Sequence, residues 1–108
     1  MNQYSGVLDA PNLKGLIMAT LLVDHEVTDY GAWRAVYDSV DGVRARSGVT
    51  SQRVLQDTAN PNHVVVEHVF PDAAAARAFL EGADLREAMG RAGVIDGSLR
   101  ALILEDVG

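Results

Sequence analysis

The sequence contains no cysteine, a single lysine and only three prolines among its 108 residues. Without cysteine the chain has no disulfide, no thiolate nucleophile and no thiolate metal ligand, which agrees with a reducing compartment. Acidic residues outnumber basic ones by 15 to 9, and the net charge is -6. The field around such a chain repels phosphate backbones and anionic membranes, so neither nucleic acid nor a membrane is an expected partner.

Long apolar runs are also missing. The longest, residues 16–23, includes Thr20 and is far too short to cross a bilayer. Residues 1–14 have neither the basic segment nor the apolar core of a secretion signal. We therefore expect a cytoplasmic protein with an N-terminal arm over residues 1–14 and a single domain over residues 15–108.

The hydrophobic period changes several times along the chain and predicts the order of the elements. Apolar runs of strand length alternate with stretches of three- and four-residue spacing, which is typical of amphipathic helices. Two β-rich runs flank a loop containing Pro and Asn, which indicates a hairpin. The sequence predicts strands over residues 15–25, 49–57, 63–70 and 97–107, and helices over residues 27–48, 73–82 and 85–93.

Residues suited to helix ends refine these ranges. Thr28 or Asp29 can cap the first helix, and the apolar stripe of that helix leaves Arg44 on its outer side. Gly82 interrupts the second helical stretch, and Asp84 can cap its continuation. The order β-α-β-β-α-β then specifies an α+β fold, in which both helical stretches cover one face of a four-stranded antiparallel sheet.

The hairpin register predicts which polar residues share a face. Closing the hairpin with Asp57 opposite His63 places Gln52 opposite His68 and Arg53 opposite Glu67. The pair of Gln52 and His68 shares its face with several valines, while the other face carries Arg53 and Glu67 among further apolar residues.

Two helical layers cannot cover both faces of this sheet, and the chain has no further element to supply. A second copy packed sheet to sheet is the economical solution, with Arg53 and Glu67 at the dimer interface. The alternative is a solvated ion pair at the rim, which contributes only about 0–1 kcal/mol.

Three stretches together resemble a known superfamily. "VDHEVTDYGAWRAVYD", "GVTSQRVLQDTANPNHVVV" and "PDAAAARAFLEGADLREAMGRAGV" are similar to the dimeric α/β barrels with ferredoxin-like subunits, in particular the small antibiotic-biosynthesis-monooxygenase-like proteins. The resemblance covers about residues 15–106. It implies a homodimer and a ligand cavity between sheet and helices. In the quinone monooxygenases a strand supplies an Asn and a Trp to hold the ligand, and the matching strand here, residues 64–70, has neither.

His68 is the main catalytic candidate, because its face is the more apolar one and should lie beneath the helices. A partly desolvated imidazole stays neutral near pH 7 and can accept a proton from an acidic phenol or enol, with Gln52 hydrogen-bonding it or the ligand. The alternative is a core histidine that Gln52 or a backbone group satisfies.

The candidate ligand-binding residues are mostly aromatic. Trp33 and Tyr37, one turn apart, either wall an aromatic ligand or simply belong to the core. His25, at the end of the first strand, either reaches the cavity mouth or closes the following turn, which is the simpler role. Phe70 shares the face of His68, and His63 is expected to be solvated beside the hairpin loop.

No metal or cofactor is expected. The histidines lack the i, i+4 spacing of a helical zinc site, nothing singles out a haem ligand, and no phosphate-binding or dinucleotide motif is present. The leading hypothesis is an enzyme that performs cofactor-independent proton-transfer chemistry, such as monooxygenation, cyclisation or isomerisation, on a hydrophobic aromatic or polyketide-like molecule. The alternatives are a non-catalytic ligand-binding or stress-associated homodimer and a scaffolding dimer without a cavity.

Overall fold

The computed structural model describes residues 17–108, so the predicted arm over residues 1–14 lies outside the described residues. Four strands and four helices follow one another in the order expected for this fold. They are β1 (Ala19–Glu26), α2 (Tyr30–Ser39), α3 (Asp41–Arg46), β2 (Ser51–Asp57), β3 (Asn60–Phe70), α4 (Ala73–Glu81), α5 (Ala83–Arg91) and β4 (Arg100–Glu105).

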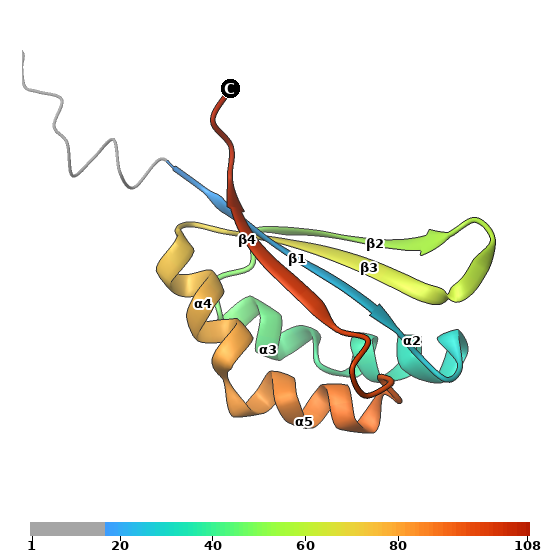
Figure 1. Cartoon of the computed structure of the whole chain (residues 1–108). Coiled ribbons are helices and arrows are strands. Elements are labelled where there is room, and N and C mark those ends of the chain that lie inside the picture. The colour runs from blue at the N-terminus through green and yellow to red at the C-terminus, as the bar shows by residue number, and fades with distance from the viewer. Residues whose placement is uncertain (1–16) are drawn as a thin grey trace, which may run out of the picture.

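The strands form one antiparallel sheet in the order β2-β3-β1-β4, and all four helices lie on the same side of it (Figure 1). The predicted α+β, ferredoxin-like β-α-β-β-α-β fold is confirmed. Within residues 17–108, no helix combines the length and the apolar character needed to cross a bilayer.

The first predicted helix is broken at Val40 into α2 and α3. Asp29 caps α2 by accepting a hydrogen bond from Ala32 N at 2.8 Å. At the other end the Ser39 hydroxyl donates to Val36 O at 2.7 Å, and the Val40 N–H donates to the carbonyl three residues back instead of four. Such local side-chain bonds compete with the helical ladder, so the chain turns and α3 starts in a new phase.

The second helical stretch divides at Gly82, as predicted, because Gly82 adopts an extended conformation. Asp72 caps α4 through Ala75 N at 2.8 Å. The prediction that Asp84 caps α5 is wrong: Asp84 lies in the first turn of α5, and Gly82 occupies the cap position without a side-chain bond.

The hairpin register is confirmed for Gln52 opposite His68 and Arg53 opposite Glu67. The prediction that Asp57 faces His63 is wrong, because the ladder shifts after Gln56 and Asp57 pairs with Asn60. Asp57 Oδ1 accepts from Ala59 N at 2.8 Å, and Asn60 Oδ1 accepts from Asn62 N at 3.0 Å. These side-chain bonds close a tighter turn than the five-residue loop expected from the sequence.

The helix-covered face of the sheet carries two groups of buried residues. One group lies under α4, and the other lies between α2, the end of α5 and the near ends of β1 and β3. The buried members are Ala19, Leu21, Val23, Phe70, Ala76 and Phe79 in the first group, and Val27, Trp33, Tyr37, Val64, Val66 and Ala92 in the second.

Candidate functional site

A cavity of about 60 Å³ lies between the two groups of core residues, with the sheet as its floor and α2, α3 and α5 as its roof. Its walls are mostly apolar. The polar groups among its lining residues are two histidines, the Trp33 indole N–H, the Tyr37 hydroxyl, one arginine and Asp84. The lining residues are Val23, His25, Trp33, Val36, Tyr37, Val40, Val43, Arg44, Val66, His68, Phe79, Asp84, Leu85, Ala88, Met89 and Ala92.

On the floor of the cavity, the His68 side chain lies against the side chain of Tyr37. His68 lies on β3 and is only 4% exposed, and its Nε2 lies 3.0 Å from the Tyr37 hydroxyl. The two rings are nearly parallel, with an interplanar angle of 10° and centroids 5.9 Å apart. The Nδ1 of His68 is buried and has no hydrogen-bond partner among the described residues.

Burial sets the ionisation of both groups. Desolvation, helped by the positive charge of Arg44, lowers the pKa of His68 to about 4, so the imidazole is neutral near pH 7. Desolvation raises the pKa of Tyr37, which therefore keeps its proton. The Tyr37 hydroxyl either donates to Nε2, leaving Nδ1–H as a donor, or accepts from Nε2–H, leaving the Nδ1 lone pair free. In the second tautomer His68 is a proton acceptor.

The opposite end of the cavity is formed by His25 and Trp33. The predicted turn role of His25 is wrong: it lies within β1, is 3% exposed and lines the cavity, with its ring centroid 5.6 Å from that of Trp33. Burial lowers its pKa, and its Nδ1 has no partner among the described residues. Because His68 pairs with Leu21, four residues from His25 on β1, the two histidines are separated by roughly 13 Å along the strands.

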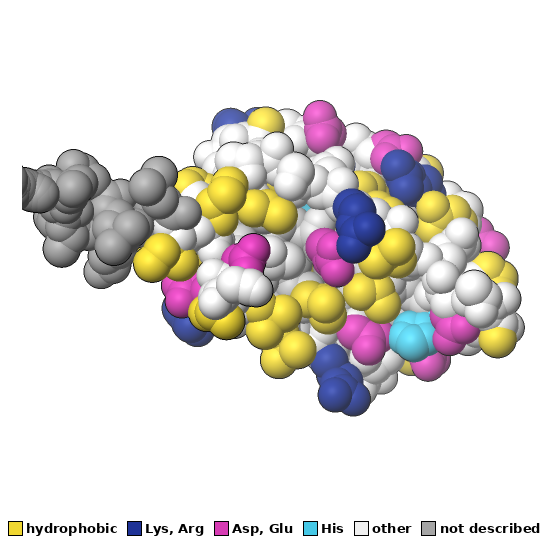
Figure 2. All heavy atoms as spheres, turned by 90° about the horizontal axis from the view of Figure 1, so that it is seen from above, with side chains coloured by type: hydrophobic (Ala, Val, Ile, Leu, Met, Phe, Trp, Pro, Cys, Tyr) yellow, Lys and Arg dark blue, Asp and Glu magenta, His cyan; other side chains and the backbone are white. Residues whose placement is uncertain are grey.

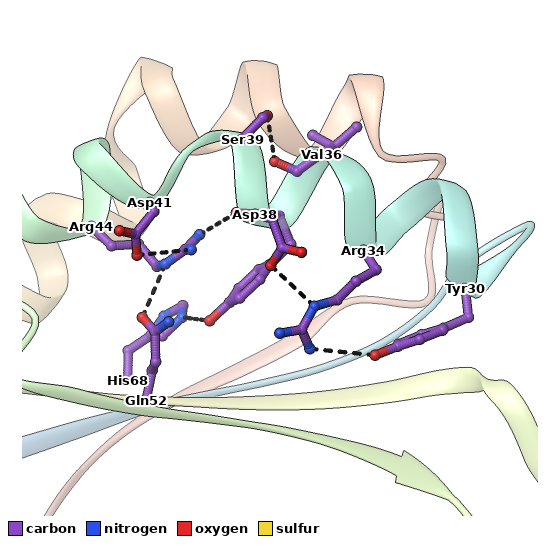
Figure 3. A network of polar contacts seen from close by, with 10 residues as sticks. Tyr30, Arg34, Val36, Asp38, Ser39, Asp41, Arg44, Gln52 and His68 are labelled. Atoms are coloured by element: carbon purple, nitrogen blue, oxygen red, sulfur yellow. Dashed lines mark hydrogen bonds and ion pairs between the residues drawn. The ribbon is translucent and has the colours of Figure 1, made fainter.

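Arg44 supplies a buried positive charge that was not predicted from the sequence. It is 3% exposed, and its guanidinium lies 3.7 Å from the centroid of the Tyr37 ring. Nη1 donates to Tyr37 O at 2.7 Å, and Nε donates to Gln52 Oε1 at 3.0 Å (Figure 3). Continuous helical periodicity placed Arg44 on the outer side. The break at Val40 rotates α3 and turns this side chain inward. In the sequence, the nearby Gly42 was the only sign that the helix is weak at this point.

Two predicted site residues have neighbours other than those expected. Gln52 lies opposite His68, but its side-chain oxygen accepts from Arg44, so the expected bond between Gln52 and His68 is replaced. Phe70 is fully buried against Phe79, with ring centroids 5.5 Å apart, and is not among the residues that line the cavity. Trp33 and Tyr37 stack on each other at 4.9 Å, line the cavity and also belong to the second core group.

The other face of the sheet carries the remaining polar candidates. Arg53 and Glu67 form the predicted ion pair, with Nη2 and Oε1 2.9 Å apart. His63 is not simply solvated: its Nε2 lies 2.6 Å from Asp24 and its Nδ1 lies 3.0 Å from Asp57. These two carboxylates raise the pKa of His63.

Comparison with solved structures identifies the fold independently. SnoaB, a cofactor-independent oxygenase from Streptomyces nogalater, superposes with a TM-score of 0.64 at 15% identity, covering 85% of this chain and 93% of that one. A proposed antibiotic biosynthesis monooxygenase from Bordetella bronchiseptica gives a TM-score of 0.71 at 11% identity, covering 84% and 98%. A dimeric ferredoxin-like protein of unknown function from Jannaschia sp. CCS1 gives 0.63 at 22% identity, covering 82% and 99%.

No protein-family model and no curated protein matches the sequence. At these identities the similarity concerns the fold. The resemblance to antibiotic-biosynthesis-monooxygenase-like proteins that the sequence indicated is therefore confirmed at the level of the fold.

Proposed function

Proceeding from a fold shared with cofactor-independent oxygenases, we propose that this chain binds a small hydrophobic aromatic or polyketide-like molecule and performs proton-transfer chemistry on it without a cofactor. The observation that carries the proposal is the buried Tyr37–His68 pair, which joins the roof to the floor of a mostly apolar cavity. An apolar pocket with a few convergent polar groups is the usual form of a small-molecule site.

His68 is the proposed catalytic base. Its neutral imidazole accepts a proton through Nδ1, while Tyr37 holds the ring in position through Nε2. In a monooxygenation the resulting substrate anion reduces O₂ and forms a carbon–oxygen bond. Protonated His68 then returns its proton to the peroxide anion, and the resulting hydroperoxide loses water and leaves a carbonyl group. The protein contributes the base, the orientation and the exclusion of bulk water.

The size of the cavity sets a condition for this function. About 60 Å³ holds roughly four water molecules, so an aromatic ligand requires α5 to move away from α2 and α3. Met89 lies on this roof, and its flexible side chain adapts to a ligand more readily than a branched one. The break between α4 and α5 at Gly82 provides a point about which α5 can move.

The proposed assembly is a homodimer in which the open faces of two sheets pack together, with Arg53 and Glu67 at the interface. Figure 2 looks onto this face and shows apolar side chains around charged ones. The largest exposed apolar residues on the strands of this face are Leu55, Leu102 and Leu104. A structural neighbour described as a dimeric ferredoxin-like protein supports a dimeric assembly.

A non-catalytic binding role is the second candidate, and the pKa of His68 favours it. A base whose conjugate acid has a pKa of about 4 removes protons only from strongly acidic or electrostatically stabilised ligands. In this reading Tyr37 and His68 only orient the molecule that occupies the cavity.

Turnover measurements separate the two candidates. Native mass spectrometry of the protein from its producing cells would identify a retained molecule, and its conversion can be followed with an oxygen electrode and by chromatography. For an enzyme we expect His68→Ala to lower turnover by about 10²–10⁴-fold. His63→Ala, the same change on the other face, should leave turnover unchanged. Equal turnover by wild type and His68→Ala would show that His68 is not the base, and no conversion of the retained molecule by wild type would leave only the binding role.

A further inference from the structure

Arg44 has hydrogen-bonding capacity beyond its contacts within the protein. A guanidinium carries five N–H donors. Three hydrogen bonds are formed, to Tyr37 O, to Gln52 Oε1 and, at 3.3 Å, to Asp41 Oδ1. Two N–H groups have no partner among residues 17–108, and they belong to a side chain that lines the cavity.

The charge of Arg44 is also incompletely compensated. Its acidic partner Asp41 is 74% exposed, whereas the Arg44 side chain is 4% exposed. Water weakens the attraction to such an exposed carboxylate, while the buried guanidinium has lost its own hydration. Of the other described lining residues, only Asp84 is acidic, and it is exposed. The buried part of the cavity wall therefore carries a positive charge beside His68, and the carboxylates nearest to it face water.

A second hollow adjoins the cavity on the side of α3, the helix that carries Arg44. This more open hollow of about 180 Å³ shares Val43, Phe79, Asp84 and Leu85 with the cavity. It lies between α3, the end of α4 and the start of α5. Asp84 on this shared wall repels anions, but its charge faces water and is screened over about 8–10 Å.

We infer that Arg44 binds the ionised oxygen of the ligand, so that the cavity takes aromatic phenols or enols as their anions. This inference rests on the proposed function, because it requires the same cavity to bind an aromatic molecule. Charge-assisted hydrogen bonds from a desolvated guanidinium are among the strongest that a binding site can offer. Arg44 stabilises the anion that forms when the ligand gives its proton to His68, the proposed base.

Arg44 also has a structural use, since its bond to Tyr37 O holds the end of α2 against α3. A test of ligand binding must therefore measure the charge state of the ligand as well as the affinity. 4-Nitrophenol is a suitable probe, because the phenol and the phenolate absorb at different wavelengths. 4-Nitroanisole, its methyl ether, has nearly the same shape and cannot ionise.

In wild type we expect 4-nitrophenolate to bind at least about tenfold more tightly than 4-nitroanisole, and the bound phenol to ionise at a lower pH than in water. Arg44→Gln should abolish both effects while 4-nitroanisole still binds. Arg44→Lys, which keeps the charge but not the fork of donors, should retain part of the preference. Arg46→Gln removes an exposed positive charge from the same helix and should change nothing.

The possible results distinguish this inference from the proposed function. Equal binding of the phenolate and the ether by wild type would overturn the role of Arg44 and leave the apolar cavity standing. Preferential binding of neutral 4-nitrophenol would do the same. Failure of both probes to bind would overturn the inference together with the proposed cavity. These comparisons need only wild-type protein, so they hold even if Arg44→Gln does not fold.

Discussion

His68 couples the candidate site to the stability of the fold. In the unfolded chain its pKa is near the ordinary value of 6.5, whereas in the folded protein burial lowers it to about 4. The unfolded state therefore binds a proton first as the pH falls. The free energy of unfolding therefore keeps its full value above pH 6.5. It falls by about 3 kcal/mol between pH 6.5 and 4, because the unfolded chain takes up a proton at His68 and the folded protein does not.

Replacing His68 by glutamine should remove most of this pH dependence while keeping a hydrogen-bond partner for Tyr37. Urea unfolding at about pH 7 and about pH 4.5 measures it: wild type should lose more stability between the two than His68→Gln. Identical losses in both proteins would show that His68 is not protonated on unfolding in this range.

His63 is a control with the opposite sign. Its hydrogen bonds to Asp24 and Asp57 raise its pKa, so its stabilising contribution is present below pH 6.5 and is lost as the pH rises through the folded-state value. His63→Gln should therefore reduce the loss of stability as the pH rises, and not the loss of stability as the pH falls.

The segment after α5, where Val94 pairs with Val27, depends on the positive φ angles of two glycines. Gly93 has a φ of +76°, and a Cβ at this position would lie 2.6 Å from the Thr28 Oγ1. Gly97 has a similar φ of +80°, but a Cβ there would meet no side chain or distant backbone atom within 4 Å. The two glycines thus separate backbone strain from a steric clash.

Gly97→Ala should lower the free energy of unfolding by about 1–2 kcal/mol, which is the cost of a left-handed conformation. Gly93→Ala should cost about 1–3 kcal/mol more because of the clash. Combining Gly93→Ala with Thr28→Ala should remove this extra cost in a double-mutant cycle. If Gly93→Ala and Gly97→Ala have the same effect, the contact with Thr28 has no steric importance.

The open face of the sheet is the proposed dimer interface. Leu102 on β4 is 54% exposed, and its strand neighbour Leu22 lies on the same face. Apolar side chains on a sheet face without a covering layer indicate an interface. A charged group at its centre should prevent two copies from packing together.

We expect wild type to sediment as a dimer and Leu102→Arg to sediment as a monomer, because an unpaired buried charge is strongly unfavourable. Ala78→Arg introduces the same side chain at an exposed position of α4 and should remain dimeric. Sedimentation velocity at micromolar concentration measures both. A monomeric wild type, or a dimeric Leu102→Arg, would contradict the proposed assembly.

The sequence by itself determined the order of the elements, the division of the sheet into two faces and the pairing of Gln52 with His68. Period-two and period-three-to-four patterns are local properties of the chain, and the antiparallel register between Ser51 and Gln56 is the predicted one, although the pair from which it was started, Asp57 with His63, does not form. This is why His68 was correctly placed beneath the helices and Arg53 opposite Glu67.

Only the tertiary structure decided where Arg44, His25 and His63 lie. A single break at Val40 changes the phase of every later residue in the helix, so periodicity placed the Arg44 side chain on the wrong side. The hydrogen bonds of His63 join residues on three different strands, and no local pattern specifies them. Burial, charge and hydrogen bonding between distant segments arise when the elements pack, and they convert a predicted core face into a cavity with a buried cation.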